Sequence, residues 1–165
     1  MTRNRRLMFA VGAAVAGSLL TGSLIRATPS SMLVARGTFA DAFKVKRMDK
    51  SVNWQVEVDA KPNLDVAVQT IDFPAGDQSS WHTHPGPVFI TVAQGTMTFY
   101  ESDDPNCEPT VRNAGEGFLD VGDHAHIARN ESAAPARNVV VYLAPPGKPL
   151  RVDQPNPGNC AFRGF

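Results

Sequence analysis

The chain has 165 residues, of which 42% are hydrophobic and only 19% charged, and its 16 basic and 16 acidic side chains give a formal net charge of zero. A chain of this length is expected to form a single domain. Nucleic-acid binding calls for a basic face or stripe, so a neutral chain gives no reason to expect a nucleic-acid partner.

Residues 1–30 have the pattern of an export signal or a membrane anchor. Three arginines, the last two being Arg5 and Arg6, precede an uncharged apolar stretch at 7–20, which is the order found in secretory signal peptides. The arginine pair also resembles a twin-arginine signal, which serves proteins exported in the folded state. Because 7–25 approaches the roughly 20 residues of a membrane span, an uncleaved anchor is the alternative. We expect a periplasmic, cell-surface or extracellular protein that contacts the membrane only if this segment is retained.

The rest of the chain has the pattern of an all-β domain. Residues 31–50 form a lead-in without strong periodicity, and the expected barrel occupies 51–145. Alternating apolar and polar residues predict half-buried strands at 52–58 and 64–70. Further strands are expected at 81–84, 88–93, 96–100, 109–112, 117–121, 125–129 and 138–143. Many short strands, together with 13 glycines and 13 prolines, favour a sandwich or barrel.

All four histidines fall in two His-x-His pairs, His82 with His84 and His124 with His126. Residues two apart on a strand point to the same face, so each pair can present two imidazoles to one side. Two such strands can share one metal ion. Imidazole suits zinc, copper, iron or nickel better than magnesium or calcium. The pattern therefore predicts one divalent transition metal, and the alternative is that these are ordinary surface or core histidines.

The two cysteines favour an exported location. Cys107 lies in a turn-rich segment, and Cys160 lies in the Pro- and Gly-rich tail at 146–165. Neither has a Cys-x-x-Cys partner or the spacing of a zinc finger. We expect a disulfide between them, which an oxidising compartment would preserve and which would contribute about 4 kcal/mol by closing a loop of this length. Two free thiols are the alternative.

Two separated motifs resemble those of the cupin family, over roughly residues 64–143. The matching positions are Gly76, His82, His84 and Gly95 in the first motif and His126 and Asn130 in the second. The agreement of two half-motifs makes the resemblance specific. It implies a double-stranded β-helix, the cupin jelly-roll barrel, which holds a divalent metal. Cupins also commonly dimerise through their N-terminal strands, so a homodimer is a candidate assembly.

Carried over residue by residue, the resemblance implies that His82, His84 and His126 are metal ligands. His124 is additional and could be a fourth ligand, a residue that contacts a ligand without binding the metal, or a proton carrier. The family's glutamate ligand falls on Val88, or at a longer spacing on Phe89, and neither side chain can bind metal.

Acidic residues near the second motif could replace this carboxylate. Asp120 and Asp123 are the candidates, although acidic residues beside a glycine such as Gly122 are ordinary turn formers. Without a carboxylate, three neutral imidazoles would leave the charge of a dication uncompensated, so we expect the site to favour anions.

The resemblance implies a function as well as a fold. Three-histidine iron sites of this family resemble those of the thiol and diketone dioxygenases, in which the substrate chelates the metal. We expect an oxygenase or another oxidoreductase that acts on a small anionic molecule, with iron as cofactor and zinc, copper, nickel or manganese as alternatives. A non-catalytic module that binds a small ligand or metal is the second hypothesis, and a barrel with a vestigial site is the third.

Three aromatic side chains near the motifs are candidates for lining a substrate pocket: Trp81, Phe89 and Tyr100. Aromatic residues in strands are more often part of the core. Tyr100 and Tyr142 could also donate protons to a bound substrate, although packing is the commoner role for both.

Overall fold

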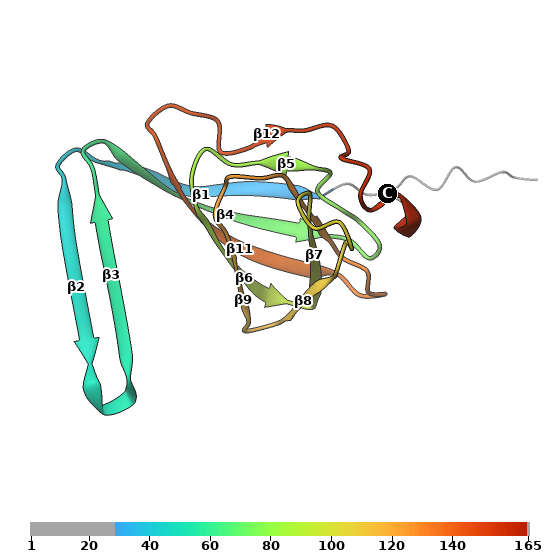
Figure 1. The fold of residues 1–165 in the computed structure, drawn as a ribbon, viewed down its shortest axis with the longest axis horizontal. Helices are drawn as coiled ribbons and strands as arrows, with labels where there is room; N and C mark the ends of the chain where they lie inside the picture. The colour runs from blue at the N-terminus through green and yellow to red at the C-terminus, as the bar shows by residue number, and fades with distance from the viewer. Residues whose placement is uncertain (1–28, 165) are drawn as a thin grey trace, which may run out of the picture.

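The computed structural model describes residues 29–164, which are almost entirely β (Figure 1). The predicted export signal falls on residues 1–28 and so lies outside the described part. The elements are β1 (Ser30–Phe39), β2 (Phe43–Asp49), η1 (Lys50–Val52), β3 (Trp54–Ala60), β4 (Leu64–Phe73), β5 (His82–Thr83), β6 (Val88–Gln94), β7 (Thr96–Glu101), β8 (Thr110–Asn113), β9 (Gly117–Asp120), β10 (His126–Arg129), β11 (Ala136–Ala144), β12 (Val152–Asp153) and η2 (Ala161–Arg163). Both η elements are short 3-10 helices. Within residues 29–164, no helix has the length and apolar character needed to cross a membrane.

Two antiparallel sheets of five strands form the barrel, with the core between them. Their strand orders are β1-β4-β11-β6-β9 and β12-β5-β10-β7-β8. The core draws on alternate residues of strands from both sheets, such as Val88 and Ile90 of β6 and Met97 and Phe99 of β7. Because side chains alternate along a strand, this single set of positions fills the interior. The double-stranded β-helix predicted from the sequence is confirmed.

The lead-in at 31–50 is more ordered than its sequence pattern suggested. β1 lies at the edge of the first sheet and pairs with β4 along its length, from Ser30 opposite Asp72 to Phe39 opposite Leu64. All ten residues of β1 are exposed, so the burial that produces a clear alternation is missing. An edge strand held mainly by backbone hydrogen bonds leaves a weak signal in sequence.

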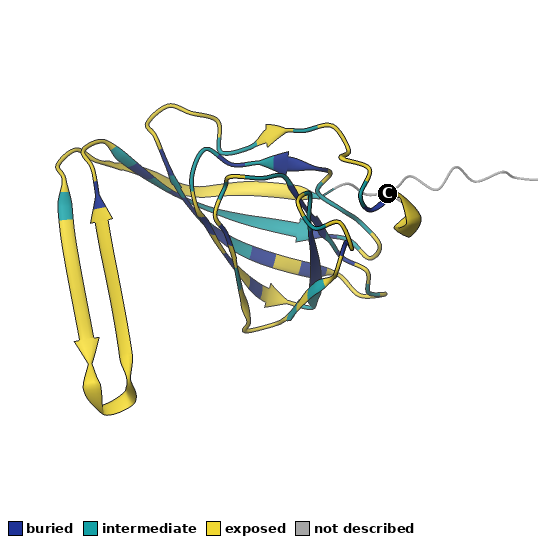
Figure 2. Ribbon diagram, viewed as in Figure 1, coloured by how far each residue is buried: buried dark blue, intermediate teal, exposed yellow. Residues whose placement is uncertain are grey.

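β2 and β3 form a hairpin that projects from the barrel, and we call residues 43–60 the arm (Figure 1). The alternation at 52–58 correctly indicated a strand, but the expectation that this strand belongs to the barrel does not match the structure. Figure 2 shows that the arm is exposed along almost its whole length. Alternation reports that one face of a strand is apolar, and it does not report what covers that face.

The C-terminal tail is fastened to the barrel. The Cys107–Cys160 disulfide is present, with 5.4 Å between the Cα atoms, as the sequence predicted. β12 pairs with β5, and the backbone N–H of Gln154 donates to the carbonyl of Trp81. These attachments carry Leu150 and Arg151 to the mouth of the barrel, beside the histidines.

Candidate metal centre

Three of the four histidines meet inside the barrel. His82 lies on β5 and is the cross-strand partner of His126 on β10, while His84 follows β5 by one residue. All three are buried, and one ring nitrogen from each lies within 4.8 Å of the others. The prediction that these residues share one site is confirmed as a cluster compatible with metal binding.

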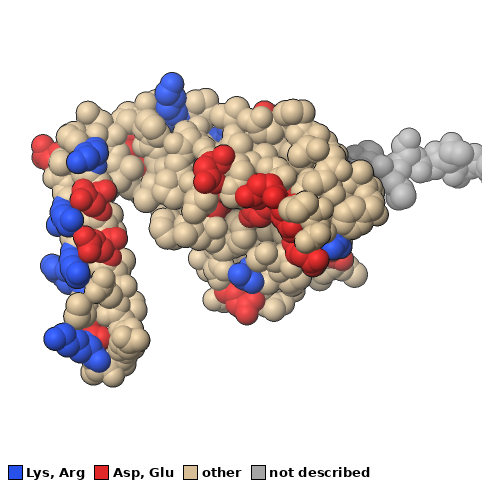
Figure 3. Space-filling view, viewed as in Figure 1, with Lys and Arg blue, Asp and Glu red and all other residues tan. Residues whose placement is uncertain are grey.

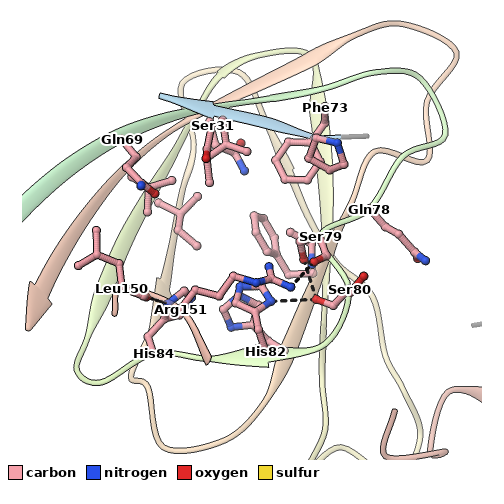
Figure 4. A pocket seen from close by; sticks show the side chains of 18 of the residues that line it. Ser31, Gln69, Phe73, Gln78, Ser79, Ser80, His82, His84, Leu150 and Arg151 are labelled. Carbon is pink, nitrogen blue, oxygen red and sulfur yellow. Dashed lines mark hydrogen bonds between the residues drawn. The ribbon is translucent and has the colours of Figure 1, made fainter. Parts of the chain in front are cut away.

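Backbone carbonyls orient two of the rings. Nδ1 of His82 donates to the carbonyl of Ser80 at 2.8 Å (Figure 4), and Nδ1 of His84 donates to the carbonyl of Leu150 at 2.6 Å. A carbonyl only accepts hydrogen bonds, so Nδ1 carries the proton and Nε2 keeps its lone pair. A metal-binding imidazole needs this tautomer and this kind of support. Both rings are therefore prepared to bind a metal through Nε2.

The protein environment keeps these imidazoles neutral. Burial, together with the nearby charges of His126 and Arg151, lowers the pKa of His82 to about 2. Burial also lowers the pKa of His84. Neutral imidazole is the form that coordinates metal, so neither residue has to lose a proton at neutral pH before it binds.

A carboxylate lies behind this cluster. Oδ2 of the buried Asp120 lies 2.9 Å from Nδ1 of His126 and 3.6 Å from Nε2 of His84. Burial alone would raise the pKa of Asp120, but the contact with His126 and the N–H of Gly122 outweigh burial and lower it. Asp120 is therefore ionised, and it completes a carboxylate–histidine pair of the kind that supports metal ligands.

Asp120 also forms the turn that the sequence suggested. Its Oδ1 accepts a hydrogen bond from the backbone N–H of Gly122 at 2.7 Å. Gly122 has a φ of +87°, and a Cβ there would lie 2.7 Å from the carbonyl oxygen of Gly86, so only glycine fits. One oxygen of Asp120 thus shapes the turn while the other faces the histidines. The turn and the site role were alternatives for Asp120 in the sequence, and the structure accommodates both.

His124 does not join the cluster. Its Nε2 lies 2.8 Å from Oε2 of Glu101, and its Nδ1 contacts Asp123. Burial alone would lower the pKa of His124, but the carboxylates of Asp123 and Glu101 raise it overall. His124 precedes β10, which begins only at His126, so the strand period does not place the two side chains on one face. His124 therefore lies outside the three-histidine group, so of the three alternatives for this residue the fourth ligand does not match the structure.

The histidines open onto a cavity of about 750 Å³ in the barrel (Figure 4). Its walls combine inward residues of both sheets with Leu150 and Arg151 of the tail. Arg151 donates from Nε to Asp153 at 2.6 Å and from Nη2 to the carbonyl of Ser79, which holds its guanidinium at the cavity. Asn138, which is buried, also lines the cavity, and its Oδ1 has no hydrogen-bond partner.

None of the three aromatic residues proposed for the pocket lines this cavity. Trp81 and Tyr100 are buried in a separate cluster with Ile127 and the disulfide, and Phe89 lies on the outer face of its sheet with 50% exposure. The reason is strand alternation: His82 faces the cavity, so Trp81 beside it faces away. Phe73, Phe99 and Tyr142 supply the aromatic lining instead.

Comparison with known proteins agrees with this geometry. The family model of the Cupin domain matches residues 69–142, which contain the histidines, Asp120 and the strands that carry them. This part of the chain is a cupin domain. No curated protein matches the sequence of this cupin.

Solved structures resemble this cupin at low sequence identity. A conserved protein with a double-stranded β-helix domain from Klebsiella pneumoniae is 18% identical, with a TM-score of 0.50 over 74% of this chain and 81% of that one. A cupin superfamily protein from Desulfitobacterium hafniense is 13% identical, with a TM-score of 0.47 over 71% and 78%. The DMSP lyase DddQ from Ruegeria pomeroyi is 19% identical, with a TM-score of 0.46 over 57% and 46%. At these identities the likeness concerns the fold alone.

Proposed function

We propose that this cupin is an exported, metal-dependent oxidoreductase, in the first place an oxygenase, that acts on a small anionic molecule. The observation that carries the proposal is the buried group of His82, His84 and His126 at the wall of a cavity large enough for a small molecule. A bound iron ion would supply redox chemistry and open coordination positions, and zinc, copper, nickel or manganese are alternative occupants.

Arg151 is the residue that favours an anionic substrate. Its guanidinium is permanently charged and lies at the cavity, near enough to lower the pKa of His82. Two hydrogen bonds, to Asp153 and to the carbonyl of Ser79, fix its position. A guanidinium held in place before binding can orient a carboxylate with little loss of side-chain entropy. We infer that Arg151 binds the anionic group of the substrate beside the metal.

Tyr142 and Asn138 add polar groups to a wall that also contains apolar residues such as Phe73. Burial raises the pKa of Tyr142 to about 12, so its hydroxyl stays protonated at neutral pH and acts as a hydrogen-bond donor. Its ring centroid lies 5.4 Å from that of His84. The unpartnered Oδ1 of Asn138 calls for a donor, because a buried carbonyl oxygen without a partner is costly. These groups suit a substrate that carries an anionic end, an apolar body and a hydrogen-bond donor.

The Cys107–Cys160 disulfide supports the exported location. Disulfides persist in oxidising compartments and are rare in reducing ones. Together with the arginine-led apolar N-terminus, it leads us to propose the periplasm, the cell surface or the extracellular space.

The test is metal analysis and oxygen uptake of protein purified from its native compartment. We expect one equivalent of iron and oxygen consumption with some members of a panel of small carboxylates and thiol-containing carboxylates. His84→Ala should abolish both metal and turnover. His124→Ala is the matched control and should retain both, because His124 lies outside the cluster. Turnover by metal-free protein would refute the assignment.

A non-catalytic ligand-binding module is the second candidate. It is favoured by the composition of the cavity wall, where the titratable groups besides the three histidines are Asp77, Tyr142 and Arg151. Tight binding of a small carboxylate without oxygen consumption in iron-loaded protein would support this second role.

A further inference from the structure

Two residues of the cavity wall carry an oxygen atom that has no partner within the described part of the chain. Oδ2 of Asp77 and Oδ1 of Asn138 are both buried atoms without a hydrogen bond, and both residues line the cavity that holds the histidines. Buried polar atoms are nearly always paired, and an unpaired one costs the folded state free energy. Two such acceptors in one cavity therefore point to a ligand that brings hydrogen-bond donors.

Asn138 interrupts a mainly apolar surface on the inner side of the first sheet. Its cross-strand partners are Ile71 on β4 and Val92 on β6, and the next inward residue on β11 is Val140. The Asn138 side chain is only 2% exposed. A hydrophobic residue at this position would pack against these neighbours without leaving a polar atom unpaired. The amide is therefore better explained by what enters the cavity than by the fold.

Asp77 lies between β4 and β5 and is held in place by its own backbone. Its N–H donates to the carbonyl of Pro74, and its carbonyl accepts from the N–H of Asn130. Oδ1 of its side chain accepts from the backbone N–H of Gln78 at 2.8 Å. These bonds use one oxygen of the carboxylate and leave Oδ2 without a partner. A fixed carboxylate oxygen of this kind suits a cationic donor, because charge-assisted hydrogen bonds are the strong ones.

The charged side chains of the arm show the more usual arrangement. In Figure 3, basic and acidic side chains lie beside each other along the arm, where Lys44 and Lys46 form ion pairs with Glu57. Each charge there has a partner of opposite sign within reach. Among residues 29–164, Oδ2 of Asp77 has no hydrogen-bond donor of this kind. The cation that is missing beside Asp77 is therefore expected to come from a ligand.

A cation of the chain itself lies in the same cavity, a short distance away. Arg151 donates from Nη2 to the carbonyl of Ser79, which follows Asp77 by two residues. Two residues span at most about 7 Å, so Arg151 and Asp77 belong to neighbouring parts of the cavity wall. The guanidinium is paired with Asp153 and not with Asp77. A ligand that carries both charges a few bonds apart could therefore contact both residues.

We propose that the cavity binds a short-chain amino carboxylate, with its ammonium group held by Asp77 and Asn138 and its carboxylate held by Arg151. The inference rests on the proposed function for the role of Arg151, and it adds a cation site and a substrate class. An ammonium group has several N–H donors, so it can satisfy both unpartnered oxygens together. In this arrangement the protein, and not the metal, binds the nitrogen of the substrate.

Matched pairs of ligands test the ammonium site. β-Alanine is compared with butyrate, and γ-aminobutyrate with pentanoate, because a methyl group replaces the ammonium group within each pair. Calorimetry on the Co²⁺-loaded protein measures the affinities. At least one amino carboxylate should bind about tenfold or more tightly than its methyl counterpart, the scale of a charge-assisted hydrogen bond. Asp77→Asn should remove this preference and leave the affinity for the methyl counterpart unchanged. Asparagine keeps an oxygen for the N–H of Gln78, so the turn should survive.

Two further variants complete the test. Asp72→Asn is the matched control and should keep the preference, because Asp72 forms an exposed ion pair with Arg137 and does not line the cavity. Asn138→Leu should reduce the preference. It should also raise the melting temperature of the ligand-free protein, since it removes a buried polar atom that has no partner. An amide that serves the fold alone would give a lower melting temperature instead.

The outcomes separate this inference from the proposed function. Equal binding within each pair of ligands would overturn the ammonium site. A preference that survives Asp77→Asn would also overturn it, because the metal would then be the group that binds the nitrogen. Failure of all four ligands to bind would overturn both the ammonium site and the role of Arg151. An Asp77-dependent preference in iron-loaded protein that consumes no oxygen would support the ammonium site and count against the oxygenase.

Discussion

Val88 and Asp120 are direct cross-strand partners, on β6 and β9. Val88 occupies the position where the cupin motif has its glutamate ligand, so the carboxylate missing from one strand is found on its neighbour. Directly opposite residues of an antiparallel pair have Cβ atoms about 5 Å apart and share a face. A carboxylate at position 120 can therefore reach the same group of histidines from the adjacent strand, and it does so through His126.

This relationship changes the electrostatics expected from the sequence. Three neutral imidazoles alone would leave a dication uncompensated, but the ionised Asp120 supplies one negative charge 2.9 Å from His126. The carboxylate contacts the imidazole of His126 and is not part of the cavity lining. Asp120 is therefore a positioning residue, which makes His126 a more basic ligand while the open side of the site remains attractive to anions.

We predict that Asp120→Asn weakens metal binding by about 10- to 100-fold, the usual effect of losing a carboxylate behind a histidine ligand. Asparagine keeps an oxygen for the N–H of Gly122, so the turn should survive. Calorimetry of a Co²⁺ titration measures the affinity, and the visible absorption of the bound ion reports the ligand geometry. Asp123→Asn is the control, since Asp123 contacts only His124 among the histidines. An unchanged Co²⁺ affinity in Asp120→Asn would remove Asp120 from the site.

The metal-free protein should lose stability as the pH falls from 7 to about 4.5. The pKa of His82 is depressed from 6.5 to about 2, and that of His84 is also lowered. Below pH 6.5 the unfolded chain therefore binds more protons than the folded chain, so the free energy of unfolding decreases as the pH is lowered. At 1.36 kcal/mol per pH unit, His82 alone contributes about 3 kcal/mol over this window.

Thermal unfolding in the presence of a chelator, at several pH values, checks this dependence. His82→Gln cannot titrate and should flatten the pH profile, whereas His124→Gln should not, because the pKa of His124 is raised and its contribution has the opposite sign. A profile with the same slope in His82→Gln as in the wild type would show that His82 is not the source.

The sequence predicted the parts of the site that depend on local periodicity. His82 and His84 lie two residues apart, on β5 and directly after it, so the strand period places their rings on the same side. The same rule does not hold for His124, because β10 starts two residues after it. Asp120 could not be chosen over other acidic residues, since its role depends on which residue lies across the sheet from Val88. That register is a long-range property of the fold and leaves no local pattern.

Arg151 illustrates the same limit at longer range. It reaches the cavity only because β12 pairs with β5 and the disulfide fastens the tail. The sequence supplied the cysteines, which predicted that the tail is tied down, but it gave no indication of which tail residue would enter the site.

Removing the disulfide should therefore affect both stability and the metal centre. We predict that Cys107→Ser with Cys160→Ser lowers the free energy of unfolding by about 4 kcal/mol, from the loop-closure entropy that the crosslink removes from the unfolded chain. It should also weaken Co²⁺ binding, because the carbonyl that orients His84 belongs to Leu150 in the same tail.

Urea unfolding and Co²⁺ titration of the double variant measure these two effects. Arg137→Gln, which breaks an exposed ion pair with Asp72 on the barrel, is a control that should change neither by much. A double variant that loses stability but binds Co²⁺ as tightly as the wild type would show that the tail does not hold His84 in place.

Arg151→Gln should weaken the binding of small carboxylates to the metal-loaded protein by about tenfold or more, the usual scale of a charge-assisted hydrogen bond. Acetate is a suitable probe, because its binding beside Co²⁺ changes the visible absorption of the ion. Arg151→Lys keeps the charge but cannot form the paired hydrogen bonds of a guanidinium, so it should recover only part of the affinity. The Co²⁺ affinity itself should not fall in either variant, because Arg151 lies beside the histidines as a positive charge and holds none of them by a hydrogen bond. Acetate binding that is unaffected by Arg151→Gln would mean that the metal alone attracts the anion.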